Sequence, residues 1–211
     1  GVQTLILFYQ RGIHLALILV LAFLLFPIAK RAWIRWPVDL AFLAGALVTG
    51  GYLVLNLDAI VNRAGFWNKT DAAMGMIATV VVLEAARRVI GPTISIIGIV
   101  FIAYAMTGPR GPFSMITLPG ILEHRGYDLP RIVSQLYLGQ EGIYGLPLGV
   151  AATFVIFVLF GAFLEITGAG QFFIDLAYAA AGRQRGGPAK ASVIASGLMG
   201  SISGSAIANV V

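Results

Sequence analysis

The sequence predicts an all-α integral membrane protein, because it combines few charges with long apolar runs and many glycines. Of its 211 residues, 59% are hydrophobic and 11% are charged, and the mean hydropathy is +0.91. Soluble domains carry roughly 25% charged residues, so this composition excludes a soluble enzyme. A disordered chain is excluded by the high hydrophobicity. The 26 glycines allow helices to pack closely or to break within the membrane.

Five segments are predicted to span the bilayer, whose hydrocarbon core requires about 20 mostly apolar residues. The first, second and fifth are free of charge over this length. The third includes Glu84 and two terminal arginines, whose long side chains can reach the headgroups, and the fourth is uncharged but slightly short. In chain order, the predicted spans are Gly12–Ala29, Leu40–Leu57, Ala72–Arg88, Pro92–Gly108 and Gly142–Leu164.

The basic residues predict the orientation of these spans. The net charge of +5 does not indicate a nucleic-acid partner, because the charges lie beside the ends of the predicted spans, where a lipid bilayer is the partner. Cytoplasmic loops carry an excess of Lys and Arg. The side expected in the cytoplasm holds Lys30, Arg31, Arg35, Arg87, Arg88, Arg183, Arg185 and Lys190. The outer side holds Arg11, Arg63, Lys69, Arg110, Arg125 and Arg131.

Four regions are expected along the chain. Residues 1–108 form a four-helix scaffold, and residues 109–141 form an outer-surface connection with a short helix at Asp128–Leu138. Residues 142–187 hold the fifth span and an arm helix, Gln171–Gly182, which is expected to lie in the membrane surface because it is too short to cross. Asp175 is expected on the wet face of this arm helix. A sixth span with a buried Asp175 is the alternative, and no other carboxylate is expected to be able to enter the membrane interior.

The last region, residues 188–211, is predicted to be the start of a re-entrant helical hairpin. Ala191–Met199 forms a half-helix of about 14 Å, and Gly200–Ser205 (GSISGS) then separates it from a second apolar segment, Ala206–Val211. Each glycine costs a helix about 1 kcal/mol relative to alanine, so a non-helical tip is expected at Gly200–Ser205. Broken helices of this kind form binding sites in secondary transporters. A close seam between two helices is the alternative.

Several motifs give the chain a family resemblance. The run GRQRGGPAKASVIASGLMGSISGSAIANVV, preceded by FGAFLEITGAGQFFIDLA, resembles the fused permease of tripartite ATP-independent periplasmic (TRAP) transporters of the TAXI type. QRGIHLAL, LEAARRVIGP and GQEGIYGLPLGV extend the resemblance over nearly the whole chain, although GGPAK and SGSAIANVV are its specific parts.

The resemblance implies a sodium-coupled elevator that imports an organic anion, such as a carboxylate, across the bacterial inner membrane. A periplasmic binding protein would deliver the anion. Residues 1–108 would correspond to the small membrane subunit, residues 142–187 to the start of the large subunit, and residues 188–211 to its first hairpin. Na⁺ is the implied coupling ion, at Ser201, Ser203 and Gly204, and no other cofactor is expected. The implied ion and substrate contacts are Gly200, Ser201, Ser203, Gly204, Ser205 and Asn209.

Permeases of this family are several times longer and contain a second hairpin. The chain is therefore expected to be the N-terminal part of a longer permease, with the remainder of that permease as a partner. The chain contains no Walker motif, which favours an ion gradient as the driving force.

Two other functions are considered. A structural stator without a substrate pathway fits residues 1–108, where few buried polar groups are expected. An intramembrane serine protease would need a histidine base near Ser203, and Ser201 occupies a position where the GxSG pattern requires glycine, so no enzyme is predicted. Glu84 is expected to pair with Arg88, four residues later, at the membrane interface.

Overall fold

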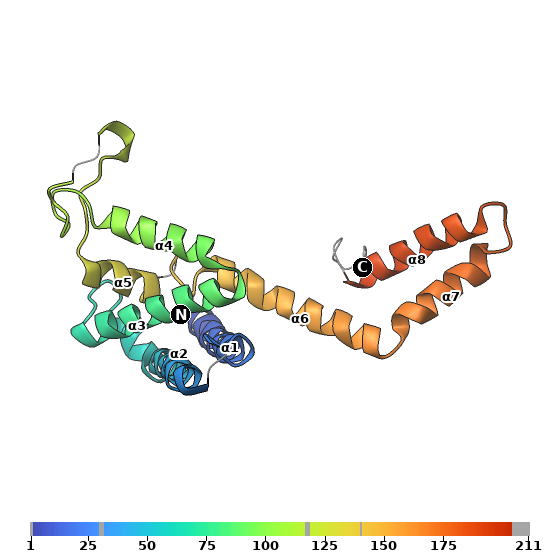
Figure 1. Ribbon diagram of the computed structural model, residues 1–211, viewed down its shortest axis with the longest axis horizontal. Helices are drawn as coiled ribbons and strands as arrows, with labels where there is room; N and C mark the ends of the chain where they lie inside the picture. Colours follow the sequence, from blue (N-terminus) through green and yellow to red (C-terminus); the bar gives the residue numbers. More distant parts are fainter. Residues whose placement is uncertain (1, 30–31, 117–118, 140, 204–211) are drawn as a thin grey trace. The chain divides into compact units, whose positions relative to one another are not determined.

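The structure is a computed structural model that describes residues 2–29, 32–116, 119–139 and 141–203. Over these ranges it consists of eight α-helices and one short 3-10 helix, with no strand (Figure 1). The chain folds as two compact units, the N-terminal unit (residues 1–149) and the C-terminal unit (residues 150–211). The prediction of an all-helical chain is confirmed.

The N-terminal unit is built around α3. α3 contacts α1, α2, α4 and α5, while α1 packs along α2. The elements of this unit are α1 (Val2–Leu25), α2 (Ala32–Asn62), α3 (Lys69–Val89), α4 (Pro92–Ala105), the 3-10 helix η1 (Gly120–Leu122), α5 (Leu129–Leu138) and the first turn of α6 (Leu146–Ile166).

All five predicted long helices are present, but the first two are longer than predicted. α1 begins ten residues before Gly12, and α2 extends beyond Leu40–Leu57 at both ends. The predicted spans stopped at charged residues, whereas both helices continue through them, because charges such as Arg11 and Asp39 have partners. Arg11 Nη1 donates a hydrogen bond to the carbonyl oxygen of Tyr144 (2.9 Å), and Asp39 accepts one from Arg88.

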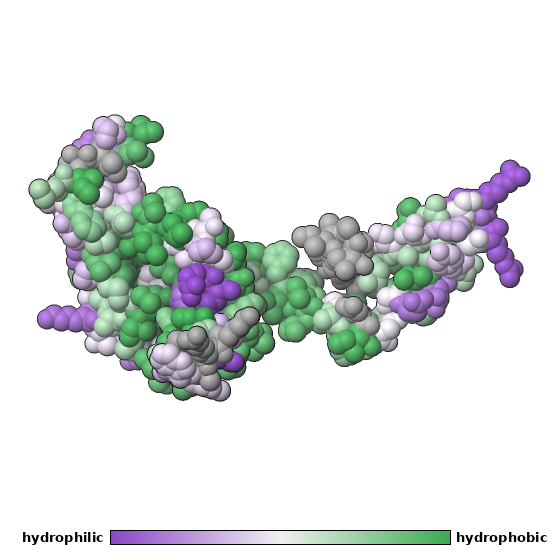
Figure 2. Space-filling model, in the orientation of Figure 1, coloured by the Kyte–Doolittle hydropathy of each residue, from purple (hydrophilic) through white to green (hydrophobic). Residues whose placement is uncertain are grey.

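Three of the described helices are long and apolar enough to cross a bilayer: Leu7–Leu25, Arg35–Asn62 and Leu146–Leu164. The chain is therefore a multi-pass membrane protein by its helix lengths and composition. Apolar side chains cover much of the visible surface of the N-terminal unit and of α6 (Figure 2). α4 is apolar but has 14 residues, about 21 Å of helix, so membrane crossing by α3 and α4 remains a prediction.

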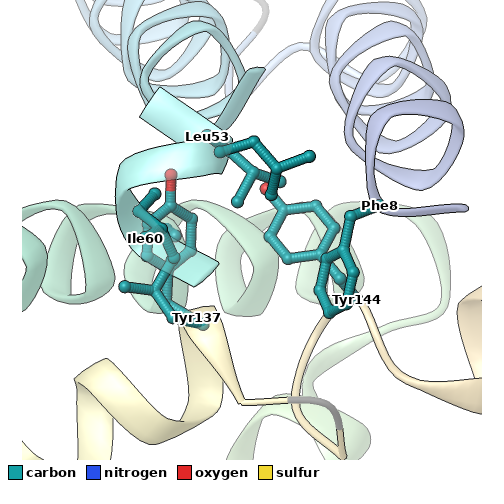
Figure 3. Packing of buried hydrophobic residues seen from close by; sticks show 8 residues of the cluster. Phe8, Leu53, Ile60, Tyr137 and Tyr144 are labelled. Carbon is teal, nitrogen blue, oxygen red and sulfur yellow. The ribbon is translucent and has the colours of Figure 1, made fainter. Parts of the chain in front are cut away.

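Aromatic and aliphatic side chains form the core of the N-terminal unit. Tyr137 of α5 and Tyr144 point toward Leu53 and Ile60 of α2, with Phe8 of α1 beside them (Figure 3). The short helix predicted at residues 128–138 is confirmed as α5, with Asp128 as its N-cap. It packs against α3 and buries one face, including Tyr137, which is 0% exposed.

Two glycines permit close helix approaches in this core. A Cβ at Gly50 of α2 would lie 2.8 Å from the Cβ of Ala16 in α1. A Cβ at Gly75 of α3 would lie 2.5 Å from the carbonyl oxygen of Val133 in α5. Both distances are shorter than a real Cβ contact, so a larger residue would separate the helices. Glycine therefore positions helices in this unit through close packing.

The C-terminal unit contains the rest of α6, α7 (Ala169–Ala181) and α8 (Gly187–Ser203). α7 and α8 pack against each other (Figure 1), with Ala177, Ala191 and Ala195 buried between them. α7 confirms that the predicted arm segment is helical, whereas its position in the membrane surface remains a prediction.

Candidate functional site

A buried carboxylate, Asp71, organises one end of the N-terminal unit. It lies in the first turn of α3 and is 0% exposed. Arg63 donates to both of its oxygens, from Nε at 3.0 Å and from Nη2 at 2.9 Å. The Tyr52 hydroxyl and the Asn68 amide donate two further hydrogen bonds, at 2.7 and 2.9 Å. A buried charge is stable only with such pairing, so these groups form one unit, the Asp71 network.

The Asp71 network also fixes the start of α3. The Asn68 side chain accepts a hydrogen bond from the Asp71 amide (2.7 Å), which completes a capping box with the reciprocal bond from the Asn68 amide. The hydrogen bonds to Asp71 raise the pKa of the Arg63 guanidinium, so Arg63 remains charged throughout the physiological pH range. The segment after α2 is thereby tied to the beginning of α3.

A cleft of about 750 Å³ lies beside this network. It is lined by the segment before α3, by the first turn of α3, and by α5 with its N-cap Asp128. Its charged lining residues are Lys69, Arg131 and Asp128. The uncharged lining residues are Gly65, Phe66, Trp67, Asn68, Ala72, Pro130, Ser134 and Gln135. The cleft therefore combines two cations, one carboxylate, amide and hydroxyl groups with two aromatic side chains.

A second charge cluster lies at the other end of α3, around Arg88. The Arg88 side chain is 3% exposed and donates from Nε to Glu84 Oε1 at 2.7 Å, which confirms the predicted pair. Its Nη1 also donates to Asp39 of α2 and to the carbonyl oxygen of Phe26 (3.2 Å). The guanidinium lies 4.9 Å from the ring centre of Phe23 in α1, a favourable cation–π distance. Arg88 thus joins the ends of three helices.

These two clusters correct two expectations about buried charge. Asp175, the only carboxylate that was expected to be able to enter the interior, is exposed, as expected for the wet face of the arm helix, and accepts a hydrogen bond from Gln171 (2.9 Å). Asp71 and Asp39 are buried instead, at 0% and 5% exposure. The expectation of few buried polar groups in residues 1–108 is therefore wrong.

The sequence contained a local pattern that indicates the role of one of these buried carboxylates, Asp71. Asn68 and Asp71 have the spacing of a capping box, which could have identified Asp71 as a fixed helix start. Asp39 has a local partner, Arg35, four residues earlier (3.8 Å), but its closer partner Arg88 is 49 residues away. Arg11, expected outside the membrane, lies within the candidate span Leu7–Leu25.

Comparison with known families identifies the class of protein. The family described as "Tripartite ATP-independent periplasmic transporter, DctM component" matches residues 77–211, which is more than half of the chain. The chain belongs to this family. No curated protein and no solved structure matches it. The predicted resemblance to a TRAP permease is thus confirmed at the level of the family, and the chain is a membrane permease component of a transporter, not an enzyme.

The predicted hairpin tip of this DctM-family chain is corrected in part. α8 continues to Ser203, so the prediction that the helix stops at Gly200 is wrong. A glycine costs a helix only about 1 kcal/mol relative to alanine, which the hydrogen bonds of a continuing helix can offset. Of the predicted site residues, α8 contains Gly200, Ser201 and Ser203. Outside the described residues lie Gly204, Ser205 and Asn209.

His124 lies in the loop after α4 of this DctM-family chain. Within the described ranges, no group of three or more His, Asp or Glu side chains could hold a metal ion. His124 Nε2 lies 2.9 Å from the carbonyl oxygen of Tyr104 and 3.2 Å from the Thr107 hydroxyl. Its place in the loop after α4 is therefore explained by local hydrogen bonds.

Proposed function

We propose that this TRAP permease component takes part in sodium-coupled uptake of an organic anion, a small carboxylate, by an elevator mechanism. In this proposal it is the N-terminal part of a TAXI-type fused permease in the bacterial inner membrane. A periplasmic binding protein delivers the anion, and the remainder of the permease completes the transport domain. Family membership carries the proposal, because it assigns residues 77–211 to the permease of a TRAP transporter.

The C-terminal unit supports an ion site near the end of α8. α7 and α8 pack through alanines, and α8 leads into SGSAIANVV. We propose that Na⁺ binds close to Ser201, Ser203 and Gly204, with Gly200, Ser205 and Asn209 nearby. The carbonyl groups at a helix C-terminus carry partial negative charge and, with serine hydroxyls, are suitable oxygen ligands for a cation. One Na⁺ that enters down 100 mV supplies about 2.3 kcal/mol.

Sodium-dependent uptake tests this proposal in the full permease, reconstituted in vesicles with its binding protein. Ser203→Ala and Gly204→Val are expected to raise the sodium concentration for half-maximal uptake about tenfold, the effect of losing one favourable contact. Ser192→Ala is the matched control, because Ser192 is an exposed α8 residue whose hydroxyl bonds to the Ala189 carbonyl. Normal uptake by both site variants at limiting sodium would contradict the proposed ion site.

A stator role is a second candidate for residues 1–108 alone. The Asp71 network and the Arg88 cluster tie α1, α2 and α3 to one another at both ends of α3, which favours a rigid body. The uptake assay separates the two roles. A scaffold variant such as Tyr52→Phe should lower the stability of the protein without changing its sodium dependence, and a changed sodium dependence would count against the stator.

A further inference from the structure

We propose that the loop between α4 and α5 attaches to the surface of the lipid bilayer through a group of exposed apolar side chains, the apolar loop surface. This proposal concerns membrane attachment and does not depend on sodium coupling or on the transported anion. Met115 and Ile121 are the most exposed members of the surface, at 97% and 101%. The other members are Phe113, Ile116 and Leu122.

Hydrogen bonds hold the base of this loop in a defined conformation. The Arg110 amide donates to the Arg125 carbonyl oxygen (2.8 Å), which joins the two ends of the loop. The Tyr104 hydroxyl of α4 donates to the Leu122 carbonyl oxygen (2.9 Å). Among the described residues, no member of the apolar loop surface belongs to a buried hydrophobic cluster. The fold therefore holds these side chains outward instead of packing them into its core.

The charges of the loop are distributed as in a segment that enters a membrane surface. Residues 111–122 contain no charged residue, and hydrophobic residues gather at the end of the loop (Figure 2). Arg110, Glu123 and Arg125 flank this run and are exposed. Interfacial segments bury their apolar part about 5–10 Å deep, at the boundary between headgroups and acyl chains, and arginine side chains can extend to the headgroups.

The exposed apolar surface of α4 is continuous in sequence with this loop. α4 contains no charged residue, and its exposed side chains include Ile94, Ile97 and Phe101. Its 14 residues cover about 21 Å, which is shorter than the hydrocarbon core of about 30 Å. In Figure 1 the end of the loop lies to one side of the α4 axis. With α4 across the bilayer, as predicted, the loop extends the apolar surface of the helix at the membrane surface.

The depth of insertion is limited by the backbone of the loop. Irregular backbone exposed to lipid does not occur within the hydrocarbon core, because its polar groups would lack partners. Between α4 and α5, the regular structure among the described residues is the short 3-10 helix η1. Water and headgroups can satisfy the remaining backbone groups at the interface, so attachment is expected there. A lipid surface would cover α4 and the loop together, which favours lipid over a protein partner.

A spin label can measure this attachment directly, because the chain contains no cysteine. Met115→Cys is made in the full-length permease, with any cysteine of the remaining part replaced by serine. The labelled protein is reconstituted in phosphatidylcholine vesicles. Electron paramagnetic resonance then compares collisions of the label with oxygen, which concentrates in lipid, and with a water-soluble nickel complex. Matched controls are the exposed residues Phe154, in a candidate span, and Arg185, in the α7–α8 turn, each replaced by cysteine. The oxygen-to-nickel ratio at position 115 should exceed that at position 185 and approach that at position 154.

Paired variants test whether the apolar side chains hold the loop in the membrane. With the label at Ile116→Cys, the pair Met115→Asp and Ile121→Asp is expected to lower the oxygen-to-nickel ratio to the value at position 185, because carboxylates leave the lipid. The pair Met115→Leu and Ile121→Leu is the matched control and should keep the ratio of the parent. Both side chains are almost fully exposed, so neither pair should change the unfolding midpoint in detergent.

Three results would overturn the proposal. The first is a label at position 115 that collides with the nickel complex as readily as the label at position 185. The second is a label that is shielded from both oxygen and nickel, since protein would then cover the loop. The third is a label that is open to nickel until the periplasmic binding protein is added, since that protein would then be the partner.

Discussion

The two units use the same residue types in different ways. In the N-terminal unit, Gly75 lies where a Cβ would collide with another helix, and Asp71 is buried in a hydrogen-bond network. In the C-terminal unit, a Cβ at Gly197 would have no atom within 4 Å, and Asp175 is exposed. Contacts within the N-terminal unit therefore determine the effect of substituting Gly75 or Asp71. Contacts within the C-terminal unit do not determine the effect of substituting Gly197 or Asp175.

The two units also differ in the apolar side chains that they bury. In the N-terminal unit, α1 and α2 bury leucines and phenylalanines in two clusters, whereas the buried cluster between α7 and α8 consists of alanines. Matched substitutions of one residue type in both units can therefore test whether stability depends more on contacts within the N-terminal unit than on contacts within the C-terminal unit.

The largest difference in stability between the two units is expected when an arginine is replaced. Arg63→Met leaves the Asp71 carboxylate buried without its cationic partner, which destabilises a protein by about 3–5 kcal/mol. Arg185→Met removes an exposed arginine of the α7–α8 turn, where substitutions change stability by less than about 0.5 kcal/mol. Thermal unfolding of the purified protein in detergent should show a midpoint about 10 °C lower for Arg63→Met. Equal midpoints for the two variants would contradict the importance of the Asp71 network.

Glycine provides the next test. Gly75→Ala places a Cβ 2.5 Å from the Val133 carbonyl oxygen, so α5 must move, and overpacking of this kind costs about 1–3 kcal/mol. Gly197→Ala meets no neighbour within 4 Å and gains up to about 1 kcal/mol of helix propensity. The unfolding midpoints should therefore move in opposite directions. A fall for Gly197→Ala as large as that for Gly75→Ala would show that the C-terminal unit packs as tightly there.

The sequence predicted the elements of the fold better than their ends. Apolar runs of sufficient length with few charges identified the five long helices, because burial in lipid imposes a composition that is visible locally. Helix ends depended on charges such as Arg11, whose partner is distant in sequence: Tyr144 lies 133 residues away. A charge ends a helix in the membrane only if it lacks a partner, and no local pattern shows that partner.

The two candidate sites also differ in how far the sequence could predict them. The glycine–serine composition at residues 200–205 predicted a break, but the structure continues the helix through Ser203. The cleft beside α5 had no counterpart in the sequence predictions, because Lys69 and Ser134 come together only through the packing of α5 on α3. Such a site depends on tertiary contacts, such as the close approach at Gly75, that a single sequence does not display.

Replacing a tyrosine by phenylalanine in each unit is expected to give the smallest difference in stability, and it tests a single hydrogen bond. Tyr137 is 0% exposed, and its hydroxyl donates to the Thr49 carbonyl oxygen, so Tyr137→Phe should remove about 1 kcal/mol and lower the midpoint by about 2–4 °C. Tyr178→Phe alters a tyrosine of α7 that is 49% exposed, and no change is expected. Because each substitution removes a single oxygen atom and leaves the ring, the difference between the two measures the hydrogen bond between α5 and α2. An unchanged midpoint for Tyr137→Phe would mean that α5 is held by its apolar contacts alone.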